Sequence, residues 1–171
     1  MTASPSREVE LKVMPRRETP QVQLGFPFVR ASNKLVVSVG YDGLTQHTLE
    51  RLLSEYMPSS LVDIRVSPSF NNYAITRESV SNALKSFQVK YFHLRELANQ
   101  YVGDSLDYRW ALEKYAASLA TNEHLTTLHD LIENGPILLL GRTSVHERSE
   151  RSVLVDELQR RWRSFDLLVH A

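Results

Sequence analysis

The sequence predicts an α/β fold, a mainly parallel β-sheet with helices on both faces. Short apolar runs recur along the chain, and the clearest, Ile137 to Leu140, lacks the alternation of a strand with one exposed face. Segments with apolar residues three and four positions apart separate these runs. Strands that alternate with helices are joined by right-handed crossovers and lie parallel to one another. We therefore expect one Rossmann-like, three-layer domain with an N-terminal extension.

Five short, mostly apolar runs are expected to form the strands. Gly40 ends the first of them, and Ser67-Pro68 stops the second, because both break a strand. The predicted strands are Leu35 to Val39, Ser60 to Val66, Val89 to His93, Ile137 to Leu140 and Phe165 to Val169.

Five segments with helical spacing lie between these strands. In the second of them Thr76 precedes the first turn, where its hydroxyl group can cap the helix. The predicted helices are Thr45 to Tyr56, Thr76 to Phe87, Asp107 to Leu119, Asn122 to Glu133 and Glu147 to Arg163.

The first 33 residues differ from the domain predicted over residues 34–171. Four prolines interrupt any helical period in this N-terminal extension, but its end is apolar, with Phe26, Phe28 and Val29 among its residues. Two interpretations follow. The apolar end packs along its own domain, or residues 1–29 dock on a protein partner or on a second copy of the chain.

Composition excludes several classes of function. Lys and Arg together number 20, as do Asp and Glu, so the net charge is zero. This charge gives no general reason to bind nucleic acid or membranes, although a local basic patch is compatible with it. There is no cysteine, which excludes disulfides, thiolate metal ligands and cysteine nucleophiles. No apolar run is long enough to span a bilayer and no signal peptide is apparent, so the expected location is the cytoplasm.

Polar residues follow four of the predicted strands and are expected at one rim of the sheet. In parallel α/β sheets ligands bind at the carboxyl ends of the strands. The segment Gly141 to Arg151 opens the last helix, whose free N–H groups favour anions, and Arg142, Arg148 and Arg151 add positive charge there. The other segments at this rim are Gly40 to Gly43, Asp63 to Arg65 and Tyr91 to Glu96.

Three motifs in this order resemble a family catalogued as domain of unknown function 488. The turn V-S-V-G-Y-D-G-L fits the family's first strand and turn, and Asp63-Ile64-Arg65-Val66-Ser67-Pro68 matches its D-V-R-x-x-P. The segment from Tyr91 to Ala98 matches Y-x-H-L-x-E-L-G/A. The resemblance extends from about Leu35 to Trp162 and is carried by the motifs together, since each alone is weak.

The chain departs from this family where the family has reactive residues. The family's fourth strand runs L-L-C-A-E, and a C-H-R triplet opens its last helix. In this chain the first cysteine corresponds to Gly141, the glutamate to Thr143 and the C-H pair to Ser149-Glu150, and only Arg151 is kept. The resemblance therefore implies a divergent member that cannot use those cysteines or that histidine.

The residues at the rim supply candidates for ligand binding and catalysis. The candidate ligand-binding residues are Tyr41, Asp63, Arg65, His93, Arg142 and Arg151. In an active protein Asp63 or Glu96 would be the general base and His93 the proton shuttle. Asp63 and Arg65 could equally form an ion pair that orients the next loop. No metal is expected, because His93 and Glu96 have no third ligand.

Two functions are therefore compatible with the sequence. The first is binding of a small anionic or nucleotide-like ligand at the rim, although neither G-x-G-x-x-G nor a P-loop follows the first strand and no cofactor is indicated. The second is a catalytically degenerate interaction or regulatory subunit that docks through residues 1–29. The sequence does not decide whether the protein is an enzyme.

Overall fold

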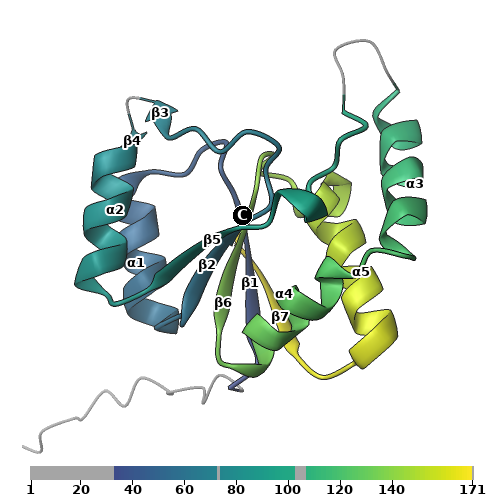
Figure 1. Cartoon of the computed structure of the whole chain (residues 1–171). Coiled ribbons are helices and arrows are strands. Elements are labelled where there is room, and N and C mark those ends of the chain that lie inside the picture. Colours follow the sequence, from purple (N-terminus) through teal and green to yellow (C-terminus); the bar gives the residue numbers. More distant parts are fainter. Residues whose placement is uncertain (1–32, 73, 103–106, 171) are drawn as a thin grey trace, which may run out of the picture.

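The computed structural model describes residues 33–72, 74–102 and 107–170, and these form a three-layer α/β domain (Figure 1). Five parallel strands form the central sheet in the order β5-β2-β6-β1-β7. Their bounds are β1 Leu35–Gly40, β2 Ser60–Asp63, β5 Lys90–His93, β6 Ile137–Gly141 and β7 Asp166–His170. The predicted fold class is confirmed. The expectations for residues 1–29 lie outside the described residues.

Helices cover both faces of the sheet (Figure 1). The pair α1 and α2 packs on one face, and α3, α4 and α5 pack on the other. Their bounds are α1 Gln46–Tyr56, α2 Arg77–Ser86, α3 Tyr108–Leu119, α4 His124–Glu133 and α5 Glu150–Trp162. Two short 3-10 helices, η1 Arg95–Leu97 and η2 His146–Arg148, and a small ribbon of β3 Asn71–Asn72 and β4 Ile75–Thr76 complete the described chain. No helix in the described part of the chain is long and apolar enough to cross a bilayer.

The strands are apolar on both sides because each side faces a separate core. Leu138 and Leu140 of β6 point into the core beneath α1 and α2, whereas Ile137 and Leu139 point into the core beneath α3 to α5. All four side chains are almost completely buried. A strand between two cores needs apolar residues at every position, which explains the missing alternation.

Local hydrogen bonds set where the first two helices begin. Thr45 Oγ1 accepts a hydrogen bond from the Thr48 amide at 3.1 Å, which caps α1. Thr76 caps α2 as expected, and Ser79 completes a reciprocal capping box with it. Each cap satisfies an N–H group that lacks a partner within its helix.

The β3–β4 ribbon was not predicted, and two predicted elements differ from the structure by three residues at one end. Strand β2 ends at Asp63 and not at Val66, because the Asp63 carboxylate accepts the Arg65 amide at 3.0 Å and turns the chain out of the sheet. Helix α5 begins at Glu150 and not at Glu147, because Ser149 is extended and its hydroxyl donates to the His146 carbonyl of η2.

Candidate functional site

A pocket of about 640 Å³ opens at the carboxyl ends of the strands. Residues that follow β1, β2, β5 and β6 all line it, including Tyr41, Arg65, Arg95 and Arg142. The neighbouring strands β1 and β6 lead to helices on opposite faces of the sheet. The Tyr41 and Asp42 amides still donate to the Gly141 and Arg142 carbonyls, so the two loops diverge only beyond these residues. This arrangement opens a crevice at the position where open α/β sheets bind ligands.

Two glycines allow the chain to pack closely at this crevice. Gly40 and Gly141 end β1 and β6 and lie opposite each other in the sheet register. A Cβ atom on Gly40 would lie 2.3 Å from the Thr143 carbonyl oxygen, and one on Gly141 would lie 2.6 Å from Glu150 Oε1. The loop after β6 and the first side chains of α5 therefore lie directly against the strand ends, where only glycine fits.

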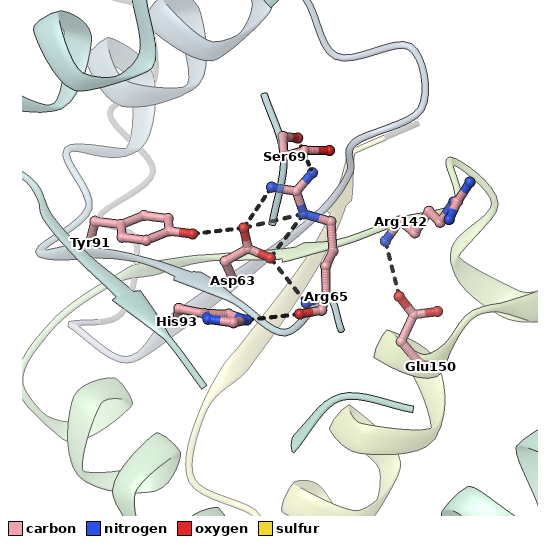
Figure 2. A network of polar contacts seen from close by, with 7 residues as sticks. All are labelled: Asp63, Arg65, Ser69, Tyr91, His93, Arg142 and Glu150. Atoms are coloured by element: carbon pink, nitrogen blue, oxygen red, sulfur yellow. Dashed lines mark hydrogen bonds and ion pairs between the residues drawn. The ribbon is translucent and has the colours of Figure 1, made fainter. Parts of the chain in front are cut away.

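Asp63 and Arg65 form a buried ion pair (Figure 2). Arg65 Nη2 and Nε donate to the Asp63 carboxylate at 2.6 and 2.9 Å, and Tyr91 donates its hydroxyl proton to the same carboxylate at 2.9 Å. Arg65 Nη1 donates to the Ser69 carbonyl at 3.0 Å, and His93 Nε2 donates to the Arg65 carbonyl at 2.8 Å. Both carboxylate oxygens and all three guanidinium nitrogens thus have a hydrogen-bond partner within the protein.

Aromatic rings enclose the same arginine. The Arg65 guanidinium carbon lies 4.2 Å from the centre of the Tyr41 ring and 4.5 Å from that of Phe70. Burial, and then the charge of Asp63, raise the pKa of Tyr91, so its hydroxyl stays protonated as a donor. The ion pair thereby fixes the position of Tyr41 at the pocket wall.

A second buried arginine organises the loop after β6. Arg151 is 0% exposed and donates to Ser38 Oγ at 2.9 Å and to the Thr143 carbonyl. Ser38 Oγ also lies 2.8 Å from His146 Nδ1. The serine hydroxyl accepts a hydrogen bond from the guanidinium group and can donate its own hydrogen bond to Nδ1 of a neutral imidazole. This network connects β1, η2 and α5.

The stability of the protein is expected to fall as the pH decreases from 7 to 5, because its surroundings disfavour the charged form of His146. Burial, and then the positive charge of Arg151, lower the pKa of His146 below 6.5, although Glu147 and Asp156 act in the opposite direction. Below pH 6.5 the unfolded chain therefore binds a proton that the folded chain does not. The free energy of unfolding should fall by up to about 1.4 kcal/mol per pH unit in this window.

Urea denaturation at several pH values measures this dependence. The matched variants are His146→Gln, which removes the buried imidazole, and His47→Gln, which changes an exposed one. The slope between pH 7 and 5 should decrease in the first variant and persist in the second. Equal slopes in both variants would contradict a neutral His146.

Several residues that line the pocket have buried polar atoms without a hydrogen-bond partner among the described residues. Asn99 is only 4% exposed, and its Oδ1 accepts the Tyr101 amide at 3.0 Å, but its Nδ2 is unpaired. Tyr108 Oη and Thr143 Oγ1 lie near each other, yet neither completes a hydrogen bond of ordinary geometry. Glu150 is 7% exposed, and its Oε1 accepts the Arg142 amide at 3.0 Å.

The structure separates the residues that the sequence predicted to act together. Three of them, Tyr41, Arg65 and Arg142, line the pocket. Asp63 and Arg151 are buried in the two networks beside it. His93 lines a separate groove next to α2, and Glu96 is exposed on η1. The described residues contain no group of three or more side chains able to hold a metal ion.

The sequence analysis did not select Asn99, Tyr108, Thr143 or Glu150 as binding residues. Thr143 and Glu150 did carry a signal, since they stand where the resembling family has a glutamate and a histidine. Asn99 and Tyr108 carried none, because each is a single polar residue near the end of a helical segment.

The fold and the pocket define an α/β domain with a polar crevice at the carboxyl ends of a parallel sheet. The family model "Domain of unknown function DUF488" matches residues 45–158 of the 171, and the chain belongs to this family. The matched region runs from the start of α1 into α5 and includes most of the residues that line the pocket. No match was found among curated proteins or among solved structures.

Proposed function

We propose that the pocket binds a small anionic ligand. The observation that supports this function is the presence of two guanidinium groups, those of Arg95 and Arg142, in the lining of one concave site. Neither side chain forms an ion pair or a hydrogen bond within the described ranges, whereas Arg65 is neutralised by Asp63. Unpaired guanidinium groups at a pocket wall are suited to phosphate and carboxylate.

The residues of the site have different roles in this proposal. Arg142 and Arg95 contact the anion, and Tyr41 forms the adjoining wall. Asp63, Arg65 and Arg151 are positioning residues, because their ion pair and hydrogen bonds hold the loops that carry Tyr41 and Arg142. His93 contributes through its hydrogen bond to the Arg65 carbonyl. The size of the pocket, about 640 Å³, suits a ligand as large as a nucleotide.

Arg142→Gln is expected to weaken binding of inorganic phosphate, pyrophosphate and AMP by about tenfold or more, since it removes a charge-assisted contact. The Arg142 amide that donates to Glu150 is unchanged by this substitution. Isothermal titration calorimetry measures the affinity, and a thermal-shift assay confirms that the variant is folded.

Arg148→Gln is the matched control, because Arg148 is an exposed arginine on the same loop and does not line the pocket. It should bind the three anions as the wild type does. Equal affinity in Arg142→Gln and the wild type, or no binding of any anion to the wild type, would contradict the proposed function.

A further inference from the structure

We propose that this pocket contains a second subsite, specific for a vicinal diol, formed by Asn99, Tyr108, Thr143 and Glu150. The ligand is then a phosphorylated sugar, either free or as the ribose 5-phosphate part of a nucleotide. This inference rests on the proposed anion site and identifies the chemical class of its ligand.

Asn99 is the first observation that points to a neutral polar group in the ligand. The Tyr101 amide occupies its Oδ1 and so fixes the orientation of the side-chain amide. Asn99 lines the pocket, and its buried Nδ2 group has no partner in the described structure. A buried N–H donor is almost always satisfied in a folded protein. An acceptor oxygen of a ligand that reaches this donor would satisfy it.

Tyr108 and Thr143 line the same pocket, and each has a buried hydroxyl group. Burial, and then the negative charge of Glu150, raise the pKa of Tyr108, so that its hydroxyl is a proton donor at neutral pH. Neither hydroxyl completes a hydrogen bond with the described residues. Both can donate to one oxygen of a ligand and accept from another.

Glu150 supplies the acceptor that distinguishes a diol from a second anion. Its carboxylate lines the pocket, and its contact within the described chain is the hydrogen bond from the Arg142 amide. A buried carboxylate repels phosphate but accepts hydrogen bonds from hydroxyl groups. A sugar hydroxyl can donate to Glu150 while it accepts from Asn99, so a pair of adjacent hydroxyls matches all four side chains.

Calorimetric titrations of the full chain test this inference. The compounds are inorganic phosphate, ribose 5-phosphate, 2-deoxyribose 5-phosphate, AMP and 2′-deoxy-AMP. Ribose 5-phosphate should bind at least about tenfold more tightly than 2-deoxyribose 5-phosphate, and AMP should exceed 2′-deoxy-AMP by a similar factor. Tighter binding of AMP than of ribose 5-phosphate assigns the ligand as a nucleotide. Equal binding assigns it as a sugar phosphate.

The preference is the ratio of the affinity for ribose 5-phosphate to the affinity for 2-deoxyribose 5-phosphate. Tyr108→Phe and Thr143→Val should each reduce this ratio toward one and leave the affinity for inorganic phosphate unchanged. Tyr108→Phe should also melt no lower than the wild type, because its hydroxyl has no protein partner. Tyr115→Phe is the matched control on the same helix, since the Tyr115 hydroxyl donates to the Leu97 carbonyl at 2.6 Å. It should melt lower and keep the preference for ribose.

Three outcomes would overturn the inference. Phosphate binding without any preference for the diol would remove the second subsite and leave the anion site standing. A preference that persists in both Tyr108→Phe and Thr143→Val would place the diol elsewhere. Failure of every compound, phosphate included, to bind would reject the proposed function together with the inference.

Discussion

Asp63→Ala is expected to lower the free energy of unfolding by about 3–5 kcal/mol, because it leaves the buried Arg65 guanidinium without its counter-charge. Asp63 is 0% exposed, and its carboxylate accepts four close hydrogen bonds from Arg65 and Tyr91. The substitution also removes the acceptor that turns the chain out of β2. Equilibrium denaturation in urea measures the effect.

A double-mutant cycle with Arg65→Ala separates a scaffold from a binding role. If the two side chains serve each other, the double variant should be little less stable than either single variant, with a coupling energy above about 1 kcal/mol. If they are instead kept for a ligand, each single change should leave stability nearly intact and abolish binding. Additive losses of stability would contradict the pairing that the structure contains.

Arg151→Ala is expected to lower the free energy of unfolding by about 3–5 kcal/mol, because it leaves a buried cavity and removes hydrogen bonds from a charged donor. Arg151 is 0% exposed and connects α5 to Ser38 of β1 and to the Thr143 carbonyl. Its side chain also lies against Gly141, where a Cβ atom would be 2.7 Å from Arg151 Cδ. Urea denaturation again measures the loss.

Arg148→Ala provides the comparison for this second result. Arg148 lies three residues earlier in the chain and is exposed, so its loss should change stability by no more than about 0.5 kcal/mol. A similar, small change in both variants would mean that the buried network around Arg151 contributes little. Anion binding by Arg151→Ala should weaken as well, because the loop that carries Arg142 loses its attachment to β1.

The two buried arginines explain how a pocket can form from loops at this end of the sheet. Arg65 packs against Tyr41, which follows β1, and Arg151 holds the segment that follows β6. The first loop is held by a cation–π contact and the second by hydrogen bonds from a charged donor. Polar attachment of this kind fixes side-chain directions, whereas an apolar contact leaves them less specified.

Much of the architecture could be predicted from local patterns. Apolar runs without alternation, separated by segments with helical spacing, predict strands between two cores that are joined by parallel crossovers. The predicted strand ends other than that of β2 agree with the structure to within one residue. The end of β2 could not be predicted from its apolar pattern. It depends on a hydrogen bond from the Asp63 side chain to the backbone, which competes with the sheet.

The sequence by itself therefore determined the α/β class, the family and the rim at which polar residues collect. Only the tertiary structure decided what those residues do there. Asp63 and Arg65 bind each other, Arg151 turns into the core, and Asn99, Tyr108 and Glu150 line the pocket beside Arg142. The physical reason is that the spacing of apolar residues along the chain reports which face of a helix or strand is buried, and many residues contribute to that pattern. The partner of a single polar group depends on segments far apart in the chain, and packing alone brings those segments together.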